Sequence, residues 1–268
     1  MLAGILSASG AAPELGERAE PVAAEGGAVV ELHAAALNPA DLAIGSGTFP
    51  AGSPPLPYVP GIEGVGTVVR SARFPAGTRV WASGRGLGVA ADGAFSERFA
   101  ASDEALYEVP AEADDVTAAA LGQVGLAAWM PLRWAAPVRP GEAVLVLGTT
   151  GNVGTVAVQA AKVLGAGRVV GAGRDEARLA AAGRLGADAT VALGGDDLQA
   201  RLAAAFDRGA PTLVLDVLWA APLEAAAAVA GPGARIVHVG QAAPSRSSGN
   251  VSVSRRIRPA AAWPTSSA

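Results

Sequence analysis

The chain has 268 residues, a length that suggests about two domains. It contains no cysteine, which excludes disulfides, thiolate zinc sites and cysteine nucleophiles. A formal net charge of −4 gives no general attraction to nucleic acid or to an anionic membrane, so we expect a small-molecule substrate and neither of those partners.

Two apolar stretches bear on where the protein works. Residues 1–13 carry no basic residue before a short apolar run, so they predict a first strand rather than an export signal. The long apolar stretch over residues 116–136 is interrupted by Gln123, Pro131 and Arg133, and it therefore does not predict a membrane span. We expect a cytoplasmic protein.

Residues up to about 120 show the pattern of an irregular β-rich module. After a strand predicted at 29–34, Asn38-Pro39-Ala40-Asp41 predicts a polar turn, followed by a loop rich in glycine and proline over residues 45–60. Residues 61–70 predict a turn that leads into another strand. Further short strands are predicted at residues 79–82, 94–100 and 106–109. Short strands at such close intervals favour a small barrel.

The rest of the chain alternates between helical and strand patterns. Residues 113–135 predict two helices, broken at 122–125 and again at Pro131. An alternation of apolar strands and helices follows and predicts five strands of a parallel sheet. The strands are predicted at 144–147, 168–172, 189–193, 213–217 and 234–239, and the helices at 155–164, 176–185, 197–206 and in the alanine-rich stretch before the last strand.

A glycine-rich turn joins the first of these strands to its helix. Glycines let a backbone approach a pyrophosphate closely, while the start of a helix presents free N–H groups and a partial positive charge. We expect Gly148 and Gly151 to make that approach and Gly154 to let helix and strand touch. The turn therefore predicts a dinucleotide site formed by Gly148, Thr149, Thr150, Gly151, Asn152, Val153 and Gly154.

Arg174 stands where the second strand of this unit ends. NAD-binding proteins carry a carboxylate there for the ribose hydroxyls, whereas a guanidinium can bind a 2′-phosphate through two hydrogen bonds. NADPH is therefore the expected cofactor. The alternative is a surface arginine at a helix start, which the adjacent Asp175 could neutralise. We also expect cofactor contacts from Val217, Val239 and Gly240.

The character of the chain changes after Gly240. Serine, arginine, proline and alanine dominate, and no aspartate or glutamate follows Glu224. Apolar periodicity is lost, so residues 242–268 are expected to form an irregular basic tail. The expected domains are then a β-rich module over residues 1–121 and a nucleotide-binding unit over residues 122–241.

Several stretches, taken in order, carry a family resemblance: AAALNPAD (34–41), GTFP (47–50), LPYVPGIEGVGTVV (56–69), DGAFSERFAAS (92–102), GLAAW (125–129), RPGEAVLVLGTTGNVG (139–154) and GARIVHVGQ (233–241). Together they make the sequence similar to the medium-chain dehydrogenase/reductase superfamily, and within it to the zinc-free quinone-oxidoreductase-like branch. The resemblance implies an N-terminal GroES-like β-barrel domain for the substrate beside a Rossmann-type parallel-sheet domain for NAD(P)H, with the reaction in the cleft between them.

Departures from the zinc-dependent relatives indicate the expected chemistry. Those relatives carry a histidine before the glutamate of a Gly-His-Glu motif, where this chain has Ile62 ahead of Glu63, and they also use cysteines. With only His33 and His238 available, too few ligands exist for tetrahedral zinc, and no metal is expected. Without a Lewis acid, nothing obvious would stabilise the alkoxide formed during alcohol oxidation. A zinc-independent, NADPH-dependent reduction of a quinone or an α,β-unsaturated carbonyl fits better.

The resemblance also suggests roles on the substrate side. In this branch the asparagine of the Asn-Pro-x-Asp turn faces the active-site cleft, which makes Asn38 the candidate for a substrate contact. The alternative is an Asx-type turn former before Pro39, and Asp41 is expected to be structural. Enoyl-thioester reductases of the superfamily place a proton-donating tyrosine where this chain has Phe49, which disfavours that subclass.

The end of the chain departs from the family pattern as well. Relatives continue past residue 241 with a sixth strand and further helices, whereas this sequence reads APSRSSGNVSVSRRIRPAAAWPTSSA. We expect a truncated or frame-shifted product, in which residues 236–239 form an exposed sheet edge that offers a route to a homodimer. A non-catalytic NADPH-binding remnant of the same superfamily is the alternative function.

Overall fold

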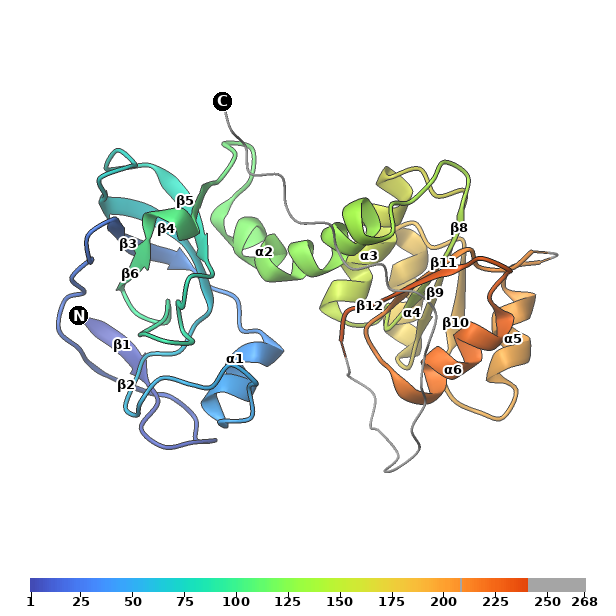
Figure 1. Ribbon diagram of the computed structural model, residues 1–268, viewed down its shortest axis with the longest axis horizontal. Helices are drawn as coiled ribbons and strands as arrows, with labels where there is room; N and C mark the ends of the chain where they lie inside the picture. The colour runs from blue at the N-terminus through green and yellow to red at the C-terminus, as the bar shows by residue number, and fades with distance from the viewer. Residues whose placement is uncertain (208, 241–268) are drawn as a thin grey trace. The chain divides into compact units, whose positions relative to one another are not determined.

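The computed structural model describes residues 1–207 and 209–240. The chain forms two compact units, Met1–Val124 and a second that begins at Gly125, drawn as ribbons in Figure 1. The division falls inside helix α2 (Asp115–Met130), slightly beyond the boundary expected after residue 121.

The first unit, all of whose residues are described, is built on an antiparallel sheet with the strand order β6-β3-β4-β5-β7. Val30, Val68 and Phe99, which come from three of its strands, are buried together in its core. A separate hairpin pairs β1 (Leu2–Ile5) with β2 (Glu14–Glu17). The strands of the larger sheet are β3 (Gly27–Ala34), β4 (Glu63–Arg70), β5 (Arg79–Ser83), β6 (Arg98–Ser102) and β7 (Leu106–Glu108), and the 3-10 turn η1 (Asp103–Ala105) joins β6 to β7.

Most of the strands predicted for this unit are confirmed, with one correction and one addition. The strand predicted over residues 94–100 begins only at Arg98. The N–H groups of Ala94 and Phe95 donate to the carbonyls of Gly61 and Pro60, and Ser96 forms only an isolated bridge with Ala3 of β1. Strand β2 was not anticipated, since its sequence ELGE lacks the apolar alternation of a buried strand.

The predicted polar turn at residues 38–41 is in fact the start of helix α1 (Pro39–Gly45). Asn38 is extended at the N-cap position, with φ −108° and ψ 156°, and Pro39 follows at the first helical position. The carboxylate of Asp41 accepts the backbone N–H of Asn38 at 2.8 Å, as in a capping box. The prediction of a turn was therefore wrong, although its residues are those of a helix start.

The second unit contains the predicted parallel sheet. Its order over the described residues is β10-β9-β8-β11-β12, and each neighbouring pair is parallel. The strand order reverses at β8, so the carboxyl ends of β8 and β11 form the switch point where α/β proteins bind ligands. The strands are β8 (Ala143–Leu147), β9 (Arg168–Gly173), β10 (Ala189–Ala192), β11 (Leu213–Asp216) and β12 (Arg235–His238).

Helices cover both faces of this sheet (Figure 1). Val144 and Val146 of β8 pack with Val158 of α3 on one face, whereas Leu145 and Leu147 pack on the other face. This alternation is why a doubly covered strand reads as a continuous apolar run. The helices are α3 (Asn152–Val163), α4 (Glu176–Arg184), α5 (Leu198–Ala204) and α6 (Ala220–Val229).

Helix α2 corrects the prediction of two helices broken at residues 122–125. It runs without interruption from Asp115 to Met130 and ends where Pro131 begins a π-helical turn, η2 (Pro131–Ala135). Nothing among the helices of the described segments is both apolar enough and long enough to cross a membrane.

Strand β12 lies at one edge of the described sheet, as expected. The homodimer predicted to form through it stays a prediction. The tail predicted over residues 242–268 lies outside the described residues.

Candidate active site

The turn between β8 and α3 packs too closely for side chains at two of its glycines. Gly148 has φ +85°, and a side chain there would overlap Val217. A side chain at Gly154 would overlap the carbonyl oxygen of Gly148, so this glycine brings α3 against the strand end. Gly151 is the N-cap of α3, and the space around it is open apart from the Gly148 carbonyl 3.4 Å away. Free N–H groups at the start of a twelve-residue helix therefore face an open backbone surface.

A cavity of about 550 Å³ lies over this turn at the carboxyl edge of the sheet. Of the predicted cofactor residues, the lining includes Gly148, Thr150, Gly151, Arg174 and Val217. The complete lining is Gly148, Thr150, Gly151, Gly173, Arg174, Asp175, Arg178, Leu193, Val217 and Leu218.

The other predicted cofactor residues lie around this cavity without lining it. Thr149 is buried below the turn, where its hydroxyl donates to the carbonyl of Val146 at 2.8 Å. Val239 follows β12, and its N–H donates to the carbonyl of Asp216 at 2.7 Å. Of the remaining four, Asn152, Val153 and Gly154 form the first turn of α3, and Gly240 lies beside Val217.

Arg178 is a cavity residue that sequence reasoning missed. Its Nη1 donates to the carbonyl of Thr150 at 3.0 Å, which holds the guanidinium against the glycine-rich turn. The available signal was a second arginine close after Arg174, in the first turn of the predicted helix. Asp175, suggested as a counter-charge for Arg174, instead caps α4 by accepting the backbone N–H of Arg178 at 3.0 Å.

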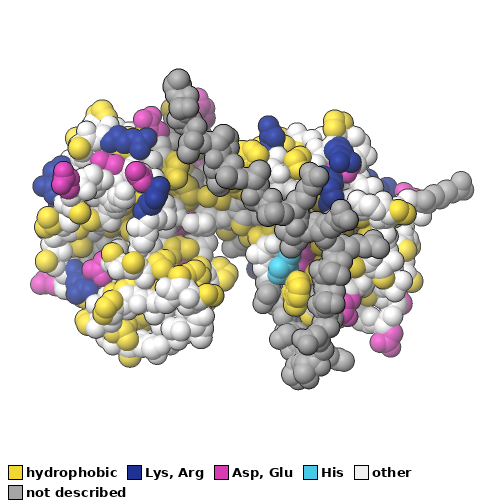
Figure 2. All heavy atoms as spheres, viewed as in Figure 1, with side chains coloured by type: hydrophobic (Ala, Val, Ile, Leu, Met, Phe, Trp, Pro, Cys, Tyr) yellow, Lys and Arg dark blue, Asp and Glu magenta, His cyan; other side chains and the backbone are white. Residues whose placement is uncertain are grey.

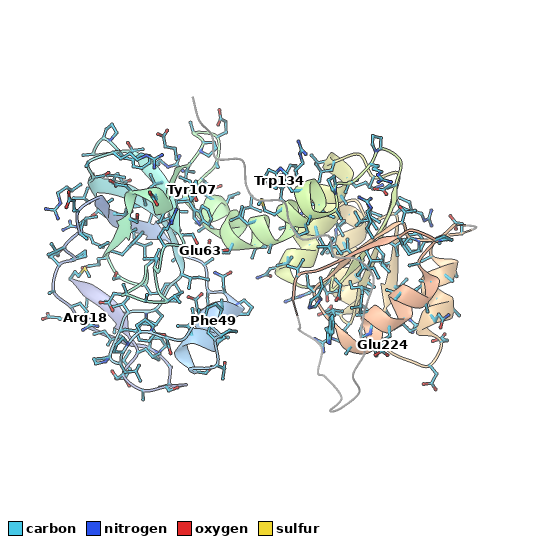
Figure 3. All side chains as sticks on the ribbon, viewed as in Figure 1. Arg18, Phe49, Glu63, Tyr107, Trp134 and Glu224 are labelled. Carbon is cyan, nitrogen blue, oxygen red and sulfur yellow. The ribbon has the colours of Figure 1, made fainter. Side chains whose placement is uncertain are left out.

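In the first unit, Asn38 is tied to a buried carboxylate. Glu63, the first residue of β4, is fully buried (Figure 3). The Nδ2 of Asn38 donates to Glu63 Oε1 at 2.7 Å. On the other oxygen, Oε2 accepts the indole N–H of Trp81 at 2.8 Å and the backbone N–H of Gln123 at 2.9 Å. These neutral donors satisfy a carboxylate that would otherwise be costly to bury.

Gly122 explains why α2 passes so close to this carboxylate. A β-carbon at Gly122 would overlap Glu63 Oε2 and come within 2.5 Å of the indole nitrogen of Trp81. The glycine therefore makes room for a buried acidic group, and it does not interrupt the helix. Beside it, Gln123 Nε2 donates to the hydroxyl of Ser83 at 2.5 Å, which extends the hydrogen-bond network.

An apolar cavity of about 510 Å³ lies beside α1 in the same unit. Leu37 and Leu42, on either side of Asn38 in sequence, line it together with Leu6 and Phe95. Leu37 and Leu42 are both exposed, and Figure 2 shows apolar side chains gathered over this part of the first unit.

Close by, Asp41 and Tyr58 are buried. Burial raises the pKa of Asp41, although hydrogen bonds from Asn38 and Ile62 oppose the shift. The carboxylate accepts the backbone N–H of Ile62 at 2.9 Å, which agrees with the structural role expected for it. Burial, followed by the charge of Asp41, raises the pKa of Tyr58. This region therefore disfavours negative charge on the groups beside the cavity.

Comparisons with known proteins bear on both units. A family described as the alcohol dehydrogenase GroES-like domain matches residues 24–111, and one described as zinc-binding dehydrogenase matches residues 152–259. The solved quinone oxidoreductase from Thermus thermophilus, whose structures include a complex with NADPH, is 32% identical with a TM-score of 0.74. The match covers 89% of this chain and 74% of that chain. The chain belongs to the medium-chain dehydrogenase/reductase superfamily.

Its similarity within the superfamily is to quinone oxidoreductases. The curated enzyme from Pongo abelii is 33% identical over 162 residues, which are 59% of this chain and 47% of that protein. The solved quinone oxidoreductase from Pseudomonas syringae pv. Tomato is 28% identical with a TM-score of 0.81, and the match covers 93% of this chain and 77% of that one. The chain spans about half the length of the curated relatives it matches. The predicted GroES-like and Rossmann-type domains are thus confirmed.

Both histidines of this chain contact side chains of the protein. The ring nitrogens of His33 lie 2.8 Å from the Asp115 carboxylate and 3.2 Å from the Thr67 hydroxyl. The Nδ1 of His238 lies 2.7 Å from Asp216, on the strand next to its own. Over the described ranges, no three His, Asp or Glu side chains are grouped so that they could hold a metal ion.

Asp216, like Glu63, is a fully buried carboxylate. Besides His238, it accepts the backbone N–H groups of Leu218 at 2.9 Å and Trp219 at 3.1 Å. Trp219 has φ +69°, a conformation that is costly for a bulky residue, and its ring lies 4.6 Å from that of His238. The carboxylate thus holds the turn whose first residues, Val217 and Leu218, line the cavity at the carboxyl edge of the sheet.

Proposed function

We propose that this chain is a zinc-independent, NADPH-dependent reductase of quinones or α,β-unsaturated carbonyls. The observation that carries the proposal is the cavity at the carboxyl edge of the parallel sheet, where the glycine-rich turn meets Arg174 and Arg178. The similarity to quinone oxidoreductases supports the reaction class.

The residues of the turn fit a dinucleotide. Side chains at Gly148 or Gly154 would overlap protein atoms, so the close packing excludes other residues at these two positions. A pyrophosphate at the start of α3 would meet the N–H groups of its first turn, which have no acceptor within the helix, and the positive end of the helix. Arg174 and Arg178 border the same cavity and supply two guanidinium groups for a ribose 2′-phosphate.

When bound, NADPH supplies a hydride, which adds to the electrophilic carbon or ring of the substrate while water supplies the proton. The protein's part is to orient the reactants, because quinones and enones accept a hydride with less activation than ketones need. The apolar cavity beside α1 suits a flat apolar ring, and Asn38 lies beside residues that line it.

Zinc independence rests on the donors that the chain offers. Cysteine is absent, Ile62 stands at the position of the metal-binding histidine of zinc-dependent relatives, and His33 and His238 bond to carboxylates. This set does not supply the three or four ligands of a protein zinc site. We therefore propose hydride transfer without a metal, although one matching family is described as zinc-binding.

The cofactor preference is tested by removing the guanidinium groups. We expect Arg174→Gln/Arg178→Gln to raise the Kd for NADPH by about 30-fold and to leave the Kd for NADH unchanged, because only NADPH carries the 2′-phosphate. Arg184→Gln is the control and should change neither Kd. Arg184 lies on the same helix as Arg178, and its guanidinium donates to the carbonyl of Ala180. Equal losses for both cofactors, measured by calorimetry, would remove the two arginines from the preference.

The reaction is tested by following nicotinamide absorbance with 1,4-benzoquinone as the substrate. Chelator-insensitive loss of NADPH supports the proposal. Binding of NADPH without any turnover supports instead the alternative of a non-catalytic NADPH-binding protein, since ligand binding still stabilises such a fold.

A further inference from the structure

Thr150 of the glycine-rich turn packs against Gly173, the last residue of β9, and both residues line the cavity at the carboxyl edge of the sheet. A β-carbon at Gly173 would overlap the Cγ2 of Thr150, and it would lie 2.9 Å from the Oγ1 and 3.2 Å from the Cβ of the same residue. These are the three atoms nearest to that position. Thr150 therefore fills the space that a side chain at residue 173 would need.

This space, and not the backbone, is what requires a glycine at residue 173. Gly173 pairs with Ala192 of β10 in the regular register of the sheet, and its φ is not positive, so its backbone would accept any L residue. Thr150 is branched at its β-carbon, and both branches approach Gly173. Rotation about χ1 always leaves a branch in at least one of these two positions, so no staggered rotamer of threonine clears the space.

Residue 173 stands where NAD-binding units carry a carboxylate, at the end of the second strand, to bond the ribose hydroxyls. We propose that Thr150 is a specificity-determining residue for NADPH, because its branched side chain excludes such a carboxylate from residue 173. The inference rests on the proposed function, whose cofactor it concerns. It adds the exclusion of a competing group to the attraction that Arg174 and Arg178 offer to a 2′-phosphate.

The side chain and the carbonyl of Thr150 can be tested separately. The carbonyl accepts Nη1 of Arg178 at 3.0 Å, and any residue at this position supplies it. Thr150→Ala removes both branches and leaves only the β-carbon, 3.2 Å away, a contact that a shift of a few tenths of an ångström relieves. Thr150→Val keeps both branches and removes only the hydroxyl, so it is the matched control.

The first measurement is the thermal unfolding of the full-length protein without cofactor. Gly173→Ala should lower the Tm by about 5 °C when residue 150 is threonine or valine, because the added methyl group overpacks the turn. When Thr150→Ala is also present, Gly173→Ala should lower the Tm by less than about 1 °C. An equal fall in all three backgrounds overturns the proposal.

The second measurement is the Kd for NADH, obtained by calorimetry on the same three backgrounds. Gly173→Asp introduces the missing carboxylate. Together with Thr150→Ala it should lower the Kd for NADH by about tenfold, because the ribose hydroxyls can then donate to a carboxylate. With threonine or valine at residue 150 it should not lower this Kd. Tighter NADH binding in the threonine background, or no tightening in the alanine background, overturns the proposal.

Loss of folding is also an informative result. If Gly173→Asp folds only together with Thr150→Ala, the block by the branched side chain is supported, whereas loss of folding in all three backgrounds overturns it. Failure of the proposed function is distinguishable from these outcomes. Equal affinity of the unaltered protein for NADPH and NADH, or absence of quinone turnover, contradicts that function but alters neither the Tm comparison nor the comparison of NADH affinities among the variants.

Discussion

Glu63 in the first unit and Asp216 in the second are both fully buried carboxylates, yet they are satisfied in different ways. Asp216 bonds to the backbone two and three residues ahead of it, and to His238 on the neighbouring strand. Glu63 bonds to groups that lie 25, 18 and 60 residues away. The first arrangement is mostly a local turn, whereas the second joins three separate segments.

This difference separates what each carboxylate does. Asp216 shapes one turn at the rim of the nucleotide cavity and can do so largely with its own chain neighbours. Glu63 holds together the start of α1, strand β5 and helix α2, so the polar geometry of the substrate side depends on several segments at once. We therefore expect the Glu63 network to be the more sensitive of the two to changes in packing.

The largest expected effect comes from Gly122→Ala. In a helix interior, alanine is normally more stable than glycine by about 1 kcal/mol. At Gly122 the added methyl group would overlap Glu63 Oε2, so we expect a loss of about 3 kcal/mol in the free energy of unfolding, from overpacking and broken hydrogen bonds. Urea denaturation measures it.

Gly183→Ala is the matched control for that change. Gly183 also lies in a helix, α4, and a β-carbon there meets no atom within 4 Å. We expect this variant to be stabilised by up to about 1 kcal/mol, as ordinary helix propensity requires. If both variants were stabilised alike, the account of Gly122 would be wrong.

A smaller effect is expected from Asp216→Asn. The remaining oxygen can still accept the N–H groups of Leu218 and Trp219, but the new NH₂ group faces His238 Nδ1, which then has to act as the acceptor. We expect a loss of about 2 kcal/mol in the free energy of unfolding and a change of the His238 tautomer, seen by nitrogen NMR.

Asp175→Asn is the control for this substitution. Asp175 also accepts a backbone N–H at the start of a helix, but no histidine bonds to it, and asparagine caps helices equally well. It should therefore cost almost nothing. An unchanged His238 tautomer in Asp216→Asn would contradict the roles assigned to this pair.

Local features of the fold could be predicted from the sequence alone. The glycine-rich turn and the parallel sheet were predictable because their signals are local: a buried strand, spaced glycines and an amphipathic helix within one stretch of chain. The start of α1 was misread as a turn because Asn38 and Asp41 suit both structures. Only the backbone distinguishes them.

The Glu63 network could not have been predicted in the same way. Gly122 was taken for a helix break, since nothing near it in sequence indicates that a carboxylate approaches from β4. For the same reason Asn38 was weighed between a substrate contact and a turn former, while its strongest contact, 25 residues away, was missed. Long-range polar contacts of this kind carry no periodic pattern.

The smallest effect is expected at Asp115. Unlike the two buried carboxylates, this one is partly exposed and is paired with a positively charged side chain. The hydrogen bonds from Arg79, at 2.7 and 3.0 Å, are the main cause that holds the pKa of Asp115 below its usual value, and His33 adds to them. Because the pKa is lower in the folded than in the unfolded chain, this pairing stabilises the fold above the unfolded pKa of about 4 and is lost as the pH falls.

Asp115→Asn should therefore cost about 0.5 kcal/mol at pH 7, and the difference from the unaltered protein should shrink when unfolding is measured below pH 4. Glu104→Gln, which breaks the more exposed pair with Arg85, is the control and should cost less at every pH. A cost for Asp115→Asn that stays constant between pH 7 and pH 3 would show that shape, and not charge, is what this carboxylate contributes. It would then resemble the two buried carboxylates more closely than its exposure indicates.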